Sequence, residues 1–490
     1  MSPQHRITRR TRRSALRSKS PRSECLKVRT AERQKRPKAS ESRDLRPSTF
    51  RPSTPEGPAT AIWLLVLLAL ALPALGIERF PPPDFSGGHE IPETVVPASQ
   101  ARTQAWLDVA MLALGLGLAS WISLRLRSRK GLVILSIAAL AYFGFWRRGC
   151  VCAIGSVQNV ALGLADPGYA VPLAVIAFFS LPLIVALMWG RGFCAGVCPH
   201  GAIQELVLIK PLKVPHWLDQ PLRLLPWIYL SLALLLATTG GLFIICKYDP
   251  FVGIFRMGGP RGMLLLGGGL LVLSMFVGRP YCRWLCPFGA LLGLLSRVSR
   301  FRPSVTPDHC SRCRLCESAC PYGAIHTPTT DDSSRDADAR PRPLALVVLI
   351  PLAALLFGWL GGKVGLASVA WHPTGELASQ VAMAEAGTLP EPAPDEITAW
   401  RQAGADRAAL STAIAVLERR SLFLGRLFGA GFGVAAALHL VRVRFPRATA
   451  DYVTDPADCV SCARCFTACP YERLRRGETV QLPVEGGGRA

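Results

Sequence analysis

The sequence lacks the patterns of several common cofactor and nucleotide sites. No Cys-x2-Cys-His run occurs among its 16 cysteines, so covalently attached c-type haem is not expected. Its eight histidines avoid the middles of the long apolar segments, which argues against a haem ligated by two histidines within a bilayer. No glycine-rich phosphate-binding loop joins a strand to a helix, and no nucleic-acid-binding motif accompanies the basic residues. The cysteines are therefore the main candidates for chemistry.

Charged residues are also scarce inside eight apolar segments. Half of the chain is hydrophobic (50%) and its mean hydropathy is +0.29, which is high for a soluble domain. A helix that crosses a bilayer core of about 30 Å needs about 20 apolar residues, and it satisfies its own backbone polar groups. The sequence therefore predicts an all-α polytopic membrane protein with about eight transmembrane helices. The predicted spans are 61–77, 105–124, 131–146, 169–189, 227–245, 262–278, 344–360 and 421–440.

Basic residues distinguish the two sides of the predicted membrane, because short cytoplasmic loops are enriched in Lys and Arg. Residues 125–130 and 279–342 are basic and are predicted inside. Residues 78–103 and 362–420 carry mixed or net acidic charge and are predicted outside. With eight spans, both termini are then cytoplasmic. We expect this topology in a bacterial inner membrane.

The N-terminal 1–60 segment is predicted to be a disordered basic tail. Residues 1–58 contain 17 Lys or Arg and 5 Asp or Glu, with little apolar content, which is typical of a chain that cannot form a core. Adhesion to anionic lipid, a solvated tail and an over-long gene start are the alternatives, whereas nucleic acid is not an expected partner. The segment 61–77 is predicted to be an uncleaved signal anchor.

The strongest pattern is a cysteine run that occurs twice and is typical of bacterial ferredoxins. Three closely spaced thiolates bind three irons of a cubane and a remote thiolate binds the fourth, while the trailing proline turns the chain away. Zinc, which also uses Cys-x2-Cys pairs, is the alternative, and disulfides are not expected in a reducing compartment. The first run is Cys310, Cys313, Cys316 and Cys320 followed by Pro321, and the second is Cys459, Cys462, Cys465 and Cys469 followed by Pro470.

The two runs are predicted to form one ferredoxin-like domain with two 4Fe–4S clusters. In two-cluster ferredoxins the fourth cysteine of each run binds the other cluster, so Cys469 is assigned to the first cluster and Cys320 to the second. A predicted helical hairpin separates the runs, and its two crossings return the chain to the same side. We therefore expect a small cytoplasmic α+β domain that is split by a transmembrane hairpin.

A second repeated pattern, Gly-Arg-x2-Cys-x3-Cys-Pro-x-Gly, occupies residues 190–201 and 278–289, here called the paired motifs. Each follows a predicted span that runs inward. Their four thiols are candidates for a further cluster, with redox-active dithiols or simple packing as alternatives. The neighbouring Arg191, Arg279 and Arg283 are cations and should favour thiolate. The candidate cofactor-binding cysteines are Cys194, Cys198, Cys282 and Cys286.

Cys150, Cys152 and Cys246 form a third group, which the topology places at the outer face. A metal site, a disulfide in an oxidising compartment and packing as small apolar residues remain open for them.

Together the paired motifs and the ferredoxin runs resemble those of the NapH/NosR-type membrane polyferredoxins over roughly residues 105–480. The resemblance implies that Cys194, Cys198, Cys282 and Cys286 match the membrane-surface cysteines of that family. It also implies quinone as a cofactor and redox partner proteins at the membrane. The segment 78–103 is far too short for the flavin-binding domain of NosR, so the resemblance does not identify the acceptor.

The expected domains are the tail (1–60), a transmembrane domain with the paired motifs (61–300), the two ferredoxin halves (301–330 and 450–480) and the hairpin with its outer loop (343–441). The expected function is electron transfer between a cytoplasmic or quinol donor and an acceptor at or beyond the membrane. The alternatives are a redox-linked maturation or repair factor for an extracytoplasmic metalloenzyme, and a membrane redox sensor.

Overall fold

The computed structural model describes most of the chain from Arg102 onward. Every described residue lies in the part of the chain from Ala101 to Ala490. The predicted tail and the first predicted span lie outside the described residues, as do Cys150 and Cys310. The described ranges are 102–149, 152–301, 303, 305, 313–328, 341–389, 394–404, 406–445 and 452–478.

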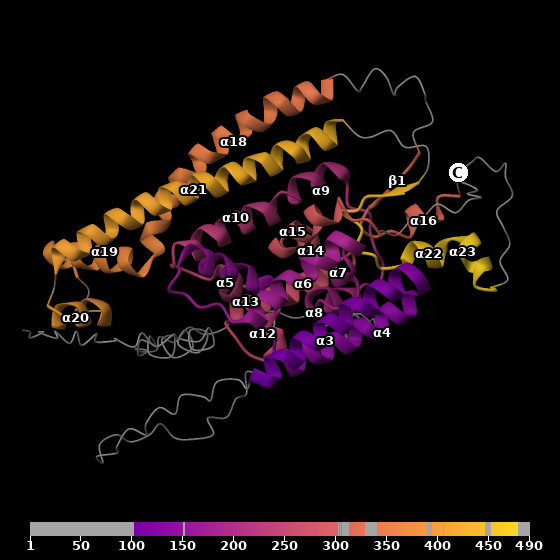
Figure 1. Ribbon diagram of the computed structural model, residues 1–490, viewed down its shortest axis with the longest axis horizontal. Helices are drawn as coiled ribbons and strands as arrows, with labels where there is room; N and C mark the ends of the chain where they lie inside the picture. The colour runs from indigo at the N-terminus through magenta and orange to yellow at the C-terminus, as the bar shows by residue number, and fades with distance from the viewer. Residues whose placement is uncertain are drawn as a thin grey trace, which may run out of the picture. The chain divides into compact units, whose positions relative to one another are not determined.

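Within these ranges, five helical segments are long and apolar enough to cross a membrane (Figure 1). Each overlaps a predicted span, so long apolar helices are confirmed at these five positions, although His216–Thr238 covers only the first part of the predicted span 227–245. The segments are Thr103–Leu126 (α3, Arg102–Trp121, continued by a π-helical turn), Arg129–Trp146 (α4, Arg129–Ala139, continued likewise), His216–Thr238 (α9, His216–Leu222, and α10, Leu225–Thr238), Leu346–Trp371 (most of α18, Pro341–Ser368, and the next turn) and Arg407–Arg444 (α21).

Two other predicted spans are shorter than expected. The segment 169–189 forms α6 (Leu173–Trp189, 17 residues) and the segment 262–278 forms α13 (Arg261–Ser274, 14 residues). Both helices begin directly after a proline, and α6 ends at Gly190, whose φ of +79° breaks the helix. The apolar residues outside these limits belong to loops, which hydropathy alone does not separate from helix.

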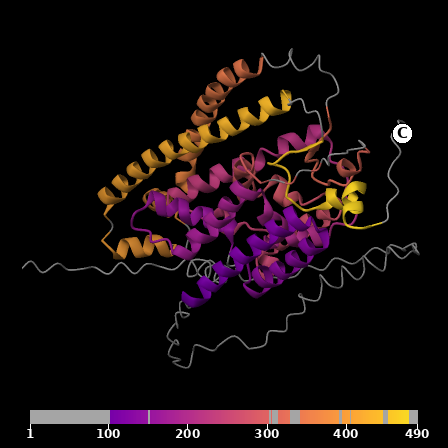
Figure 2. The same cartoon turned by 45° about the vertical axis from the view of Figure 1, so that its right-hand side comes forward.

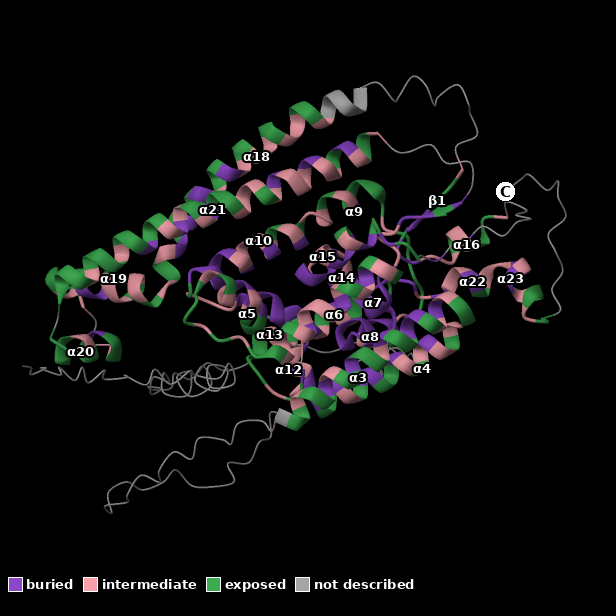
Figure 3. Ribbon diagram, in the orientation of Figure 1, coloured by how far each residue is buried: buried purple, intermediate pink, exposed green. Residues whose placement is uncertain are grey.

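A buried core lies among α5 (Ala153–Ala165), α6, α10 and α15 (Pro287–Ser296), around the short helices that carry the paired motifs (Figure 3). Phe288 and Leu292 of α15 are almost fully buried there. By contrast, Leu355 on α18 is 74% exposed, as a side chain that faces lipid would be. The remaining described helices are α7 (Gly192–Gly196), α8 (Pro199–Leu206), α11 (Ile244–Lys247), α12 (Val252–Phe255), α14 (Pro280–Trp284), α16 (Leu315–Ser318), α19 (Pro373–Glu385), α20 (Asp395–Gln402), α22 (Arg464–Ala468) and α23 (Pro470–Arg475).

The hairpin is formed by α18 and α21, which lie side by side in both views (Figures 1 and 2). Glycines make their close approach possible: a Cβ added to Gly361 would overlap the carbonyl oxygen of Gly425, and one added to Gly429 would overlap that of Phe357. A Cβ on Gly365 would meet the carbonyl of Ser421. The contacts run in opposite directions along the two helices, so the pair is antiparallel. Small residues spaced by four are typical of such membrane-helix contacts.

The hairpin helices are longer than the predicted spans 344–360 and 421–440. Helix α21 has 38 residues, which at 1.5 Å per residue is about 57 Å and exceeds a bilayer core of about 30 Å. The predicted outer loop 362–420 therefore contains the end of α18, the helices α19 and α20, and the first turns of α21. Charged residues such as Glu418 and Arg419 interrupt the apolar pattern in this part of the chain, but helix α21 continues through them.

The two ferredoxin halves meet in a two-stranded antiparallel sheet. Strand β1 (Ile325–His326) follows the first run and pairs with β2 (Val453–Thr454), which precedes the second run, in the register Ile325↔Thr454. Helix α16 of the first run packs against α22 of the second. Segments from either side of the hairpin thus form one α+β unit.

Candidate functional site

The paired motifs have the same local structure. In each, the first cysteine lies in a one-turn helix, Cys194 in α7 and Cys282 in α14. The second cysteine, Cys198 or Cys286, is the N-cap of the next helix, and the following proline is its first residue, where proline is favoured. The Cys286 sulfur also accepts a hydrogen bond from the Gly289 backbone N–H at 3.3 Å. The sequence repeat is therefore also a structural repeat.

Each motif places its arginine against the closing glycine of the other motif. A Cβ added to Gly201 would lie 3.2 Å from Nη1 of Arg279, and one added to Gly289 would lie 3.3 Å from Nη2 of Arg191. Arg279 also donates to the Cys194 carbonyl. This reciprocal packing explains why both motifs end in glycine, because a side chain there would push the arginine away.

A glutamine that follows the first motif reaches the second. Gln204 is fully buried on α8, and its amide nitrogen lies 3.4 Å from the Cys282 sulfur. Its Oε1 accepts the Tyr281 backbone N–H at 3.1 Å. The two motifs are therefore held together by side-chain contacts in both directions.

The four thiols of the paired motifs converge. Burial raises the pKa of Cys286 well above its ordinary value, and Cys282, Cys198 and Cys194 raise it further as neighbouring thiolates. Burial also raises the pKa of Cys282 to about 11, although Arg279 and Arg191 lower it. The prediction that the arginines favour thiolate gives the right direction for the cations, but burial outweighs them. Burial therefore disfavours the thiolate form of Cys282 and Cys286 in the absence of a metal, and metal binding would displace their protons.

Two buried cations beside these thiols have polar atoms without a partner. Nη2 of Arg279 and Nε of Arg191 are buried and make no hydrogen bond to the described residues. Arg191 Nη2 lies 3.8 Å from the Cys194 sulfur. Buried charges are normally paired. Four convergent thiols and two incompletely satisfied cations fit an anionic thiolate-ligated cluster.

The second ferredoxin run forms a cavity together with one cysteine of the first run. Cys320 lines it together with Cys459, Cys462 and Cys465. These four are the thiols that the sequence predicts for one cluster, including the exchanged fourth cysteine. Their role as ligands remains a prediction, but the donor set and the cavity fit a cubane.

The loops that carry the runs share an unusual backbone conformation. Arg314 in the first run and Ala463 in the second occupy the same position after a cysteine, and both have a φ of +60°. Such left-handed residues bend the chain sharply. In each run a short helix follows directly, so the chain reverses its course between the second and the third cysteine.

The other predicted ligand set is described in part. Cys313 and Cys316 belong to the α16 segment, and Cys469 is the residue that ends α22 and caps α23. Because α16 packs against α22, the structure brings these segments together. Cys310 lies outside the described residues.

Among the described residues, no three His, Cys, Asp or Glu side chains lie close enough to hold a single metal ion. A tetrahedral zinc needs its sulfurs about 2.3 Å from one centre, whereas a cubane binds each thiolate at a different corner. The thiols of Cys320, Cys459, Cys462 and Cys465 surround a cavity rather than one point.

The segments that carry the four cysteines of the paired motifs contact the segments that carry the cysteines of the ferredoxin runs. These two groups of cysteines are called the two cysteine sets. Arg191, beside Cys194, donates to the Ala457 carbonyl at 2.6 Å, two residues before Cys459. A Cβ added to Gly278 would lie 3.0 Å from the Pro321 side chain, next to Cys320. The paired motifs are thus in contact with the segments that line the ferredoxin cavity.

The third cysteine group is only partly brought together. Cys152 lines a small apolar cavity that also contacts Cys198 and His200. A Cβ added to Gly155 would lie 3.1 Å from the Cys246 sulfur. Cys152 and Cys246 are therefore both near the start of α5, and the choice among metal site, disulfide and packing stays open.

His200 and Asp249 form a buried pair that sequence reasoning missed. Nε2 of His200 lies 2.9 Å from Oδ2 of Asp249. Burial disfavours the charged imidazole, but Asp249 outweighs this and raises the pKa of His200 to about 10. The position of His200 directly after Pro199 in the first paired motif could have marked it as a candidate site residue. Nothing in the sequence indicates that it contacts Asp249.

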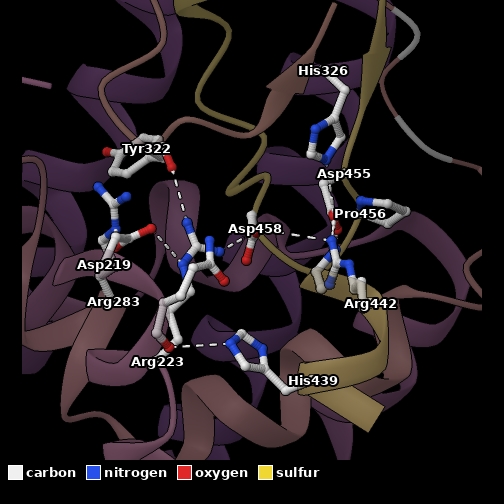
Figure 4. A network of polar contacts seen from close by, with 12 residues as sticks. Asp219, Arg223, Arg283, Tyr322, His326, His439, Arg442, Asp455, Pro456 and Asp458 are labelled. Atoms are coloured by element: carbon white, nitrogen blue, oxygen red, sulfur yellow. Dashed lines mark hydrogen bonds and ion pairs between the residues drawn. The ribbon is translucent and has the colours of Figure 1, made fainter. Parts of the chain in front are cut away.

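A polar network fixes the end of the hairpin to the second ferredoxin half (Figure 4). Arg442 of α21 pairs with Asp455 and lies 3.9 Å from Asp458, which also pairs with Arg223. Arg223 in turn pairs with Asp219 at 2.7 Å. The network therefore joins two membrane helices to the segment that leads into Cys459.

Replacement of Asp455 by alanine is expected to loosen this junction. Asp455 also accepts the Ala457 N–H at 2.9 Å, so the change removes a turn as well as an ion pair whose carboxylate is buried and whose guanidinium is partly exposed. Losing a hydrogen bond to a charged group costs about 1.5 to 3 kcal/mol. Amide exchange at Ile325 and Val453 should accelerate markedly, whereas in Glu478→Ala, which removes an exposed pair with Arg473, it should stay as in wild type. Unchanged exchange in the Asp455 variant would show that the network does not hold the sheet.

Two family models match the chain, both described as "4Fe-4S binding domain". The first matches residues 171–213 and 259–306, which contain one paired motif each. The second matches residues 303–326, which contain the first ferredoxin run. No solved structure matches the chain.

Several curated relatives are similar to part of the chain. The methylamine utilization ferredoxin-type protein MauN of Paracoccus denitrificans is 30% identical over 39% of this chain and 75% of its own length. The putative electron transport protein YccM of Escherichia coli is 30% identical over 31% of this chain and 46% of its own. The regulatory protein NosR of Pseudomonas aeruginosa is 28% identical over 41% of this chain and 30% of its own length. The chain thus spans less than half the length of YccM and NosR.

The matches begin at the paired motifs and continue into the first ferredoxin run, the features on which the predicted resemblance depends. MauN is named as a ferredoxin-type protein, YccM as a putative electron transport protein and NosR as a regulatory protein. This chain has apolar helices of membrane-spanning length. The chain therefore belongs to the NapH/NosR-type family of membrane-associated, ferredoxin-type electron-transport proteins with 4Fe–4S domains.

Proposed function

We propose that the protein passes electrons between a cytoplasmic or quinol donor and an acceptor at or beyond the membrane. The observation that carries this proposal is the contact between the two cysteine sets. Arg191 joins the Cys194 sulfur to the Ala457 carbonyl beside Cys459. Electron carriers must lie close together, and these residues bring the paired motifs to the edge of the ferredoxin cavity.

The proposed ligands come from all three cysteine patterns. The ferredoxin domain holds two clusters with exchanged fourth cysteines, and the paired motifs hold a further one. Bound clusters supply one-electron chemistry over a potential range of about −700 to +450 mV. The chain's own residues orient the thiols and place arginines beside them. The proposed ligands are Cys310, Cys313, Cys316 and Cys469; Cys459, Cys462, Cys465 and Cys320; and Cys194, Cys198, Cys282 and Cys286.

We propose the orientation that the basic loops predict, in a bacterial inner membrane. The segment 61–77 and the helices α6 and α13 then complete eight crossings, with both termini and the ferredoxin domain in the cytoplasm. The antiparallel α18–α21 pair supports this, because it returns the chain to the side from which it left. Lipid and redox proteins are the expected partners.

Electron transfer can be tested in liposomes that contain the full-length protein. Dithionite, a membrane-impermeant reductant, is added outside, and ferricyanide trapped inside is the acceptor. The wild type should reduce the ferricyanide, and Cys286→Ser should lower the rate at least tenfold, because it removes a proposed ligand. Cys25→Ser, which changes a cysteine outside all three patterns, is the control. A wild-type rate equal to that of empty liposomes would contradict the proposal and favour dithiol-based maturation.

A further inference from the structure

A buried carboxylate, Glu205, contacts residues from both cysteine sets. Its side chain is 2% exposed near the end of α8. Nε of Arg279 donates to its Oε2 at 2.9 Å, and Nη2 of Arg464 donates to its Oε1 at 2.7 Å. The Tyr322 hydroxyl donates to Oε2 at 2.7 Å, and Arg129 at the start of α4 also pairs with Oε1. Four segments of the chain therefore meet at one side chain.

Each partner of Glu205 belongs to a cysteine-bearing segment or to a membrane helix. Arg464 lies between Cys462 and Cys465 in the second ferredoxin run. Arg279 is three residues before Cys282 in the second paired motif. Tyr322 follows Cys320 by two residues, and Glu205 itself is on the helix that Cys198 caps.

The contacts keep Glu205 ionised. Burial alone would raise the pKa of its carboxyl, but Arg279, Arg129 and Arg464 together lower that pKa far below the usual range. Arginine does not lose its charge in proteins, so one negative charge faces three positive ones. Removing it would leave the buried guanidinium group of Arg279 and the partly buried ones of Arg129 and Arg464, which repel one another and attract nearby anions.

We propose that Glu205 is the positioning residue that docks the ferredoxin domain onto the paired motifs and sets the local charge at the Cys320/Cys459/Cys462/Cys465 set. This rests on the proposed function, because it assumes that this set holds a cluster. Glu205 is not itself a ligand. It acts through Arg464, which fixes the loop between Cys462 and Cys465, and through Tyr322, which fixes the turn after Cys320.

Two substitutions with opposite charge effects test the proposal in the full-length protein, purified without oxygen. A unit charge near a redox centre, at an effective dielectric constant of about 20, changes its reduction equilibrium by about tenfold. Glu205→Gln removes a negative charge and should raise the potential of one ferredoxin-type cluster, and Arg464→Gln removes a positive charge and should lower it. Tenfold corresponds to about 59 mV for one electron, which EPR titration resolves.

Docking has a readout of its own. Amide hydrogen exchange across residues 455–466 should accelerate at least tenfold in Glu205→Gln. Asp108→Asn is the matched control, since Asp108 is also a buried carboxylate paired with an arginine, Arg147 at 2.7 Å, and a tyrosine. It touches neither cysteine set, so it should leave both the potential and the exchange of 455–466 unchanged.

A conservative variant covers the case in which Glu205→Gln does not fold. Glu205→Asp keeps the charge, and its reduction equilibrium should stay within about threefold of wild type. Shifts of the same sign in Glu205→Gln and Arg464→Gln, or no shift with clusters present, would overturn the charge role. Unchanged exchange would overturn the docking role. Wild-type protein without any cluster would instead refute the proposed function, while the exchange experiment would still decide the docking.

Discussion

The substitutions Cys320→Ser and Cys462→Ser are expected to produce the same defect. The two residues belong to different ferredoxin runs, yet both line one cavity. If they bind one cluster, either change removes it and leaves the other, so the EPR signal of the reduced protein should lose the same component in both variants. Iron bound by the ferredoxin domain should fall from about eight to about four atoms per chain.

The control for this experiment is the complementary pair. Cys316→Ser and Cys469→Ser should remove the other component of the signal, and again should resemble each other. Electron transfer into liposomes should fall at least tenfold in all four variants. If Cys320→Ser resembled Cys316→Ser instead, each run would bind its own cluster, and the exchanged ligation would be wrong.

Replacement of Gly425 by leucine is expected to separate the hairpin helices. A Cβ at this position would overlap the Gly361 carbonyl oxygen, so the backbones of α18 and α21 must move apart. Overpacking of this kind costs on the order of 3 kcal/mol. Because α21 leads directly into the second ferredoxin half, we expect thermal unfolding in detergent to begin several degrees lower and the purified protein to contain less iron.

Gly431→Leu on the same helix is the matched control. A Cβ at Gly431 would meet no atom within 4 Å, so leucine there gains helix propensity without a clash. It should be as stable as wild type or more so. Equal stability of the Gly425 and Gly431 variants would show that the glycine contact does not hold the hairpin together.

Much of the ferredoxin domain could be predicted because its chemistry dictates spacing. The spacing of Cys459, Cys462 and Cys465 is the one that the ligands of a 4Fe–4S cubane need. The hairpin crosses twice, so the chain is expected to return to the side from which it left. The hairpin seam also had a sequence signal that went unused: Gly361 and Gly365 are four residues apart, as are Gly425 and Gly429. Such spacing is typical of close helix contacts in membranes.

Other parts of the site could not be predicted because their partners are distant in sequence. Glu205 follows the first paired motif, but its role exists only once Arg279 and Arg464 reach it from two other segments. Helix α6 starts later than predicted for a local reason: it begins directly after Pro172, although the hydropathy pattern begins earlier. The direction in which Arg279 shifts the pKa of Cys282 could be predicted, but sequence does not show the burial that outweighs it.

The presence of two 4Fe–4S clusters is tested most directly by a count of metal and sulfide in the full-length protein purified without oxygen, followed by EPR after reduction with dithionite. We expect at least about eight iron atoms with equal sulfide per chain. We also expect reduced 4Fe–4S signals from two clusters that respond separately to changes at Cys462 and Cys313. A protein that contains zinc without iron or sulfide, and that gives no signal on reduction, would contradict these expectations.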